Sequence, residues 1–168
     1  RTNSNFCNHS CAFRREKTSI IGQRNRRRNK RVQEVAEEQG MIALYSLFAP
    51  FLLWPVEYLL PYPHVIEELA KTVIVFSVLK NKASPAAFYK TFIAAGVLFA
   101  FSETVLYILN INSFGRVSLI FIRFFSTSIL HSTTFVIIAA FGLKNKRLIW
   151  VGFVLSVLIH YLYNLLVS

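Results

Sequence analysis

Five long apolar stretches follow a polar N-terminal segment of the chain. Between residues 41 and 168 most positions are apolar, and only short polar or proline-containing segments interrupt them. A helix needs about 20 mostly apolar residues to cross the hydrocarbon core of a membrane. The pattern therefore predicts an all-α bundle of five membrane-spanning helices, at residues 41–60, 64–79, 85–109, 117–143 and 148–167.

Prolines mark the first two of these helices. Pro50 and Pro55 lie inside the first, where we expect them to kink it. Pro61 and Pro63 follow it, and a residue before proline is pushed out of the helical conformation. The sequence therefore predicts a tight turn there, followed by a second helix that is short for a membrane span.

The composition supports an integral membrane protein. Apolar residues make up 54% of the chain and charged residues 16%, whereas soluble domains average about 45–50% and about 25%. More than half of the charges lie in the first 40 residues, so the remainder is poorer still in charge. These values exclude a soluble globular domain and a wholly disordered chain.

Residues 1–40 form a basic tail, distinct from a transmembrane domain at residues 41–168. The tail carries ten basic and four acidic residues. We expect it to lie on anionic lipid headgroups and not on nucleic acid. The chain starts with Arg1, and Met41 is its only methionine. Either the chain is a fragment or its natural start is Met41, so the tail is expected to be disordered or upstream sequence.

The loops between the apolar stretches alternate in charge. Two loops are basic, and the turn at 61–63 and the loop at 110–116 carry at most one charge. Because basic loops stay on the cytoplasmic side, the alternation predicts an N-terminus inside and a C-terminus outside. The basic loop residues are Lys80, Lys82, Lys90, Lys144, Lys146 and Arg147.

Ionisable residues inside the apolar stretches are candidates for function, because a charge within a bilayer is costly. At a rise of about 1.5 Å per residue, the acids of the second and third stretches and the histidine of the fifth reach one shallow layer near the outer side. The ionisable residues in the stretches are Glu57, Glu67, Glu68, Lys71, Glu103, Arg123, His131 and His160.

Helical spacing groups some of these residues. Lys71 lies three and four positions after Glu68 and Glu67, so it is within reach of either carboxylate. His160 and Asn164 are four positions apart and share one face of their helix. The alternatives are a structural ion pair between helices for the first group and interhelical hydrogen bonds for the second.

The residue types suit hydrolysis of an acyl bond. A buried carboxylate serves as a general base for water, and a histidine with an amide donates hydrogen bonds to an oxyanion. Glutamate and histidine are also zinc ligands, so a metal site at Glu67, Glu103, His131 and His160 stays open as an alternative.

Several of these residues form motifs that resemble the PrsW family of intramembrane proteases. Glu67, Glu68 and Lys71 resemble its Glu-Glu-x-x-Lys motif, and Gly96-x-x-Phe-x-x-x-Glu103 resembles the next motif in order. Tyr107, His131, and the pair His160 and Asn164 follow at similar places. The resemblance covers about residues 42–166. It departs from the related prenyl-protein endopeptidases, which carry a histidine at position 103 and a nearby arginine in place of Lys71.

The resemblance implies a glutamic-type peptidase that cleaves a membrane-anchored protein, such as an anti-sigma factor, near the outer face. Glu67 would be the general base, oriented by Glu68 and Lys71. The remaining residues would hold the water or a metal (Glu103, His131) and stabilise the oxyanion (His160, Asn164). No cofactor is required in this interpretation, with zinc as the alternative. The rival functions are a catalytically silent scaffold or immunity-type protein of the superfamily and a small transporter.

Overall fold

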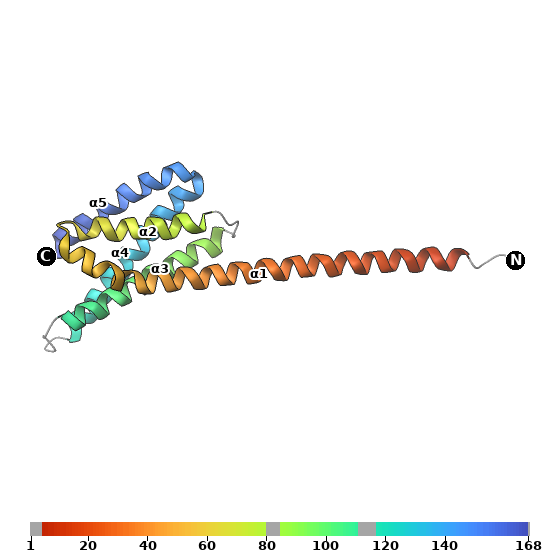
Figure 1. Ribbon diagram of the computed structural model, residues 1–168, viewed down its shortest axis with the longest axis horizontal. Coiled ribbons are helices and arrows are strands. Elements are labelled where there is room, and N and C mark those ends of the chain that lie inside the picture. Colours follow the sequence, from red (N-terminus) through yellow and green to blue (C-terminus); the bar gives the residue numbers. More distant parts are fainter. Residues whose placement is uncertain (1–4, 80–84, 111–116, 168) are drawn as a thin grey trace. The chain divides into compact units, whose positions relative to one another are not determined.

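The computed structural model describes residues 5–79, 85–110 and 117–167, and every element in these ranges is a helix (Figure 1). The all-α class is therefore confirmed, and the last four predicted helices begin and end within one residue of the observed ones. The elements are α1 (Asn5–Leu59), α2 (Pro63–Val78), α3 (Pro85–Asn110), α4 (Val117–Lys144), the short 3-10 helix η1 (Lys146–Leu148) and α5 (Ile149–Val167).

The chain divides into two compact units, Arg1–Glu38 and Gln39–Ser168. The described part of the first unit is helical, whereas disorder was one of the two alternatives considered for the tail. Lys30 and Glu34 form an exposed ion pair on it at 3.9 Å. The remainder of α1 belongs to the second unit and contains both Pro50 and Pro55.

Among the residues that the structure describes, four helical segments are long and apolar enough to cross a membrane, which supports a membrane protein. Helix α2 has 16 residues and is not one of them. Four of the five expected spans thus meet this test of length and composition. The second expected span, which corresponds to α2, and the orientation stay predictions. The four segments are Gln23–Val56, Phe88–Leu109, Ile120–Lys144 and Lys146–Leu166.

Helix α4 lies at the centre of the second unit. It packs against α3, α5 and α2, and α2 also packs against α5. Phe92 of α3 stacks on Phe135 of α4 with ring centroids 6.0 Å apart. Since lipid tails are as apolar as these side chains, close packing and interhelical hydrogen bonds hold such helices together. Polar side chains on α2, α3 and α5 therefore meet those of α4 inside the bundle.

A glycine sets the distance between α3 and α4. A Cβ atom added at Gly96 would lie 2.4 Å from the backbone of Ser132. The Ser132 hydroxyl donates a hydrogen bond to the carbonyl of Ile93 at 3.1 Å, across the same contact. Small residues of this kind let membrane helices approach closely. The contact holds α3 near enough to α4 for Glu103 to reach His131.

Candidate active site

Lys71 lies at the centre of a buried polar cluster. Its side chain is fully buried, and its ammonium contacts Glu68 Oε1 at 2.6 Å, His131 Nδ1 at 2.7 Å and Thr134 Oγ1 at 3.1 Å. An ammonium has three N–H donors and no acceptor. The three contacts therefore use all of its donors, and Lys71 joins α2 to α4 through two different side chains.

These contacts set the tautomer of His131. Because the Lys71 ammonium donates to Nδ1, this nitrogen is an acceptor, and the neutral ring carries its proton on Nε2. Nε2 lies 2.6 Å from Glu103 Oε2, to which it donates. The ring of Phe99 lies against the imidazole, with centroids 4.8 Å apart. Lys71 thus fixes which way the His131–Glu103 hydrogen bond runs.

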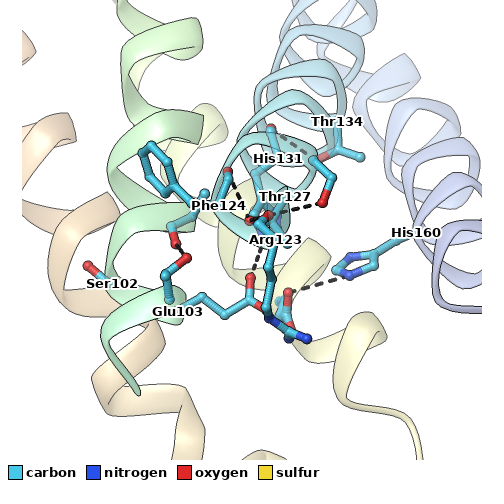
Figure 2. A network of polar contacts seen from close by, with 12 residues as sticks. Ser102, Glu103, Arg123, Phe124, Thr127, His131, Thr134 and His160 are labelled. Atoms are coloured by element: carbon cyan, nitrogen blue, oxygen red, sulfur yellow. Dashed lines mark hydrogen bonds and ion pairs between the residues drawn. The ribbon is translucent and has the colours of Figure 1, made fainter. Parts of the chain in front are cut away.

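Glu103 is held from a second side by Arg123. Figure 2 shows the side chains of Glu103, Arg123 and His131 converging from neighbouring helices, with His160 nearby. The Arg123 guanidinium donates to Glu103 Oε1 at 3.2 Å and lies over the ring of Tyr107, 4.2 Å from its centroid. Both oxygens of Glu103 therefore accept hydrogen bonds, which favours an ionised carboxylate that is already fully engaged.

The imidazole of His160 lies between the two adjacent glutamates, Glu67 and Glu68, with one ring nitrogen facing each. Its Nδ1 lies 2.8 Å from Glu68 Oε1 and donates to this carboxylate. Its Nε2 faces Glu67 Oε2 at 3.8 Å. The Glu68 side chain is fully buried, whereas 12% of the Glu67 side chain is exposed. Glu68 therefore orients the imidazole, and Glu67 is the carboxylate with access to a cavity.

Two cavities flank the Glu103–Arg123 pair. The first has a volume of about 220 Å³ and includes Glu67 in its wall, and the second has about 190 Å³ and includes His160 and Asn164. Both cavities contain Glu103 and Arg123 in their lining. Each is large enough for several water molecules at about 30 Å³ each. Water and a substrate group thus have room beside the carboxylate of Glu67.

The structure brings all seven residues of the predicted site into this one region. Of the two carboxylates within reach of Lys71 by spacing, the ammonium pairs with Glu68, while Glu67 faces His160. The predicted residues come from α2 (Glu67, Glu68, Lys71), α3 (Glu103), α4 (His131) and α5 (His160, Asn164).

Two residues of the cluster were not assigned to the site from the sequence. Arg123 was noted as an ionisable residue in a span but received no role, although it lines both cavities. Thr134 donates to the backbone carbonyl of His131, as a threonine inside a helix commonly does to a preceding turn. It also accepts from Lys71. Its spacing from His131, one helical turn on, was the available signal.

The distances between possible ligand atoms in the cluster suit a bound metal, but the hydrogen bonds of these atoms do not. Ligand atoms of Glu67, His131 and His160 all lie within 4.8 Å of one another. However, Lys71 and Glu103 occupy both ring nitrogens of His131, and a ligating nitrogen needs a lone pair. The nearby Lys71 ammonium also repels a cation. A metal here would require the His131 contacts to rearrange.

No family model, no curated protein and no solved structure matches this chain. The chemistry of the site therefore rests on its own geometry.

Proposed function

We propose that the chain is an intramembrane endopeptidase of PrsW type that hydrolyses a peptide bond with a water activated by Glu67. One observation carries the proposal. The Glu67 carboxylate borders the first cavity and also lies 3.8 Å from Nε2 of His160, in a bundle whose other helices are apolar enough to cross a membrane. Burying a carboxylate beside an imidazole inside a membrane bundle is costly, and packing of the helices does not require it. The pair is therefore a candidate for function.

The proposed reaction begins with a water in the cavity beside Glu67. The carboxylate takes a proton from the water as its oxygen attacks the carbonyl carbon of the scissile bond. The amide of Asn164 and protonated His160 donate hydrogen bonds to the resulting oxyanion. Glu67 then gives its proton to the leaving amine as the C–N bond breaks, which restores the carboxylate.

The remaining polar residues position these groups. Glu68 accepts from Nδ1 of His160 and stabilises its imidazolium form, in the role that an aspartate has beside a catalytic histidine. Lys71 holds Glu68 ionised by direct contact. Glu103 and Arg123 line both cavities and are placed to contact the substrate. No step requires a metal.

The test is cleavage of a single-span reporter peptide by purified protein, with and without a chelator. We expect cleavage that a chelator leaves nearly intact and that Glu67→Gln abolishes. Full loss of activity with chelator and its return with zinc would replace this mechanism with a metal-dependent one. Absence of cleavage of any membrane-anchored reporter by folded protein would overturn the peptidase function.

The expected substrate is a membrane-anchored protein, cut on the extracytoplasmic side of a bacterial inner membrane. The substrate class and the bacterial inner membrane rest on the resemblance to the PrsW family, and the extracytoplasmic side rests on the alternation of basic and neutral loops. In a background lacking Cys7 and Cys11, Ser113→Cys should react with a membrane-impermeant thiol reagent in intact cells, and Asn81→Cys should not. The opposite labelling pattern would place the site on the cytoplasmic side.

A catalytically silent scaffold is the second candidate, favoured by how fully the cluster is bonded. The Glu68–Lys71 and Glu103–Arg123 pairs and the histidines link four helices without any substrate. In that case the cluster would contribute only stability. Glu67→Gln separates the two functions, because Glu67 has access to the first cavity and a scaffold would tolerate its neutral replacement.

A further inference from the structure

Apolar and aromatic residues make up more than half of the lining of the first cavity. Five of its eight lining residues are apolar or aromatic, and they come from α1 and α3: Pro50, Trp54, Phe99, Leu106 and Tyr107. The other three are the charged groups of the candidate site, Glu67, Glu103 and Arg123. The cavity therefore places an apolar wall directly beside the carboxylate that is proposed to activate water.

The size of this cavity suits a large side chain. Its volume is about 220 Å³, and an apolar protein cavity of about 150 Å³ is known to bind benzene. A phenyl or isobutyl group thus fits while leaving space for about two waters. The second cavity is of similar size, about 190 Å³, but is lined by more polar groups such as Thr127, Tyr163 and Asn164.

The catalytic groups are divided between the two cavities. Glu67 lines only the first, and His160 and Asn164 line only the second. A peptide bond attacked from Glu67 and stabilised from Asn164 must therefore lie across the pair that borders both, Glu103 and Arg123. The side chain next to the scissile bond then falls into the apolar first cavity.

Arg123 has a donor that this peptide would satisfy. Its Nε is buried and has no hydrogen-bond partner in the described part of the chain. A buried donor without a partner is costly, so such a group commonly marks a binding position. The guanidinium is held by Glu103 and by the ring of Tyr107. It is therefore oriented to donate to a neutral acceptor such as a peptide carbonyl.

Charge narrows the class of side chain that the cavity accepts. Two carboxylates, Glu67 and Glu103, face it against one guanidinium, so an acidic side chain would be repelled. A basic side chain would have to bury its charge among five apolar or aromatic residues and beside the Arg123 guanidinium, which is costly. An uncharged apolar side chain remains.

We propose that the first cavity is a substrate subsite for a large, uncharged apolar side chain beside the scissile bond, and that Arg123 binds the adjoining peptide carbonyl. This inference rests on the proposed peptidase function, because it assigns the substrate of the same site. It does not depend on turnover, since a non-hydrolysing variant keeps the cavity.

Trp54 provides a direct measurement of occupancy. The chain has two tryptophans, and Trp150 lies outside the lining of both cavities. In full-length Glu67→Gln/Trp150→Phe protein, Trp54 emission should shift saturably with acetyl-Ala-X-Ala-amide peptides. We expect half-saturation at a concentration about tenfold or more lower for X = Phe or Leu than for Glu or Lys, from apolar burial. The matched control, Glu67→Gln/Trp54→Phe, keeps Trp150 and should show no saturable shift.

Adding Arg123→Gln to the Glu67→Gln/Trp150→Phe protein tests whether Arg123 binds the adjoining peptide carbonyl. The Phe peptide and the Leu peptide should both bind more weakly to this variant, and the loss of affinity should be the same for both, because the carbonyl contact does not involve the side chain X. Equal binding of all four peptides, tighter binding of the Glu or Lys peptide, or no saturable response of Trp54 to any peptide would overturn the subsite. Reporter cleavage by the wild type is read separately, so failure of the peptidase function is distinguishable from failure of the subsite.

Discussion

The polar cluster has a closed part and an open part, and two adjacent glutamates fall one in each. The closed part is Glu68, Lys71, His131 and Thr134, in which every side chain is buried and bonded to another member, and of these only His131 also borders a cavity, the second one. The open part lines the cavities and consists of Glu67, Glu103, Arg123, His160 and Asn164. Glu67 and Glu68 have the same chemistry, yet of the two only Glu67 borders one of these cavities.

The closed part holds the helices and orients His160, whereas the open part is where the proposed reaction takes place. A general base must reach a proton on a mobile molecule, and Glu68 in the closed part has no route to one. A carboxylate that orients a histidine must instead be fixed, as Glu68 is by Lys71 and His160. The two parts therefore predict different outcomes for substitutions with the same chemistry.

The largest effect on turnover should come from Glu67→Gln. We expect cleavage of a single-span reporter to fall by about 10²–10⁴-fold, the usual contribution of general acid–base catalysis. The melting temperature should change little, because this side chain borders a cavity. Glu68→Gln is the matched control and should lower the melting temperature clearly. Equal effects of the two substitutions on both measurements would erase the distinction between the closed and open parts.

Lys71→Met should produce the largest loss of stability. It leaves Glu68 as a buried charge without its cation, which typically costs about 3–5 kcal/mol. Unfolding in mixed detergent micelles measures this change. Lys30→Met removes the lysine of an exposed pair with Glu34 and should have almost no effect. Similar stability of the two variants would mean that the closed part is not a framework.

Two donors of the open part should have smaller effects on turnover. We expect His160→Ala and Asn164→Ala each to lower turnover by about 10²–10³-fold, as does loss of one oxyanion donor. Asn145→Ala, at the exposed cap of η1, is the control and should leave turnover unchanged. An Asn164→Ala variant with normal turnover would remove Asn164 from the open part and point towards a metal-based mechanism at His160.

The smallest effect concerns the helix contact that supports both parts. Gly96→Ala places a Cβ against the Ser132 backbone, and overpacking of this kind costs about 1–3 kcal/mol. Because α3 carries Glu103 and α4 carries His131, the reporter should also be cleaved more slowly. Gly40→Ala meets open space and should be neutral in both assays. Unchanged stability in Gly96→Ala would show that α3 and α4 separate without cost.

The sequence was sufficient for much of the fold. Apolar stretches between prolines and polar loops defined the ends of α2 to α5 within one residue, because the bilayer imposes one length scale on such helices. The helical continuation of α1 into the tail, from Asn5, was not anticipated. A basic, polar segment lacks the apolar periodicity from which a helix is recognised.

The members of the site were also predictable, but not their contacts. Charged residues in a span are rare enough to be noticed one by one. Helical spacing alone left Lys71 equally near Glu67 and Glu68, and the choice depends on His131 and Thr134 of α4. The position of Arg123 in the site follows from the two cavities, whose linings combine residues of α1, α2, α3, α4 and α5.

The short helix α2 has a consequence for the surrounding lipid. Its 16 residues measure about 24 Å at 1.5 Å per residue, whereas the hydrocarbon core of a bilayer is about 30 Å thick. If α2 crosses the membrane, this hydrophobic mismatch thins the bilayer locally or draws headgroups inward. Glu67 and Glu68 lie in the second turn of α2, so thinning brings water closer to them without a channel. Hydrolysis should then be faster in bilayers of short-chain lipids than in those of long-chain lipids.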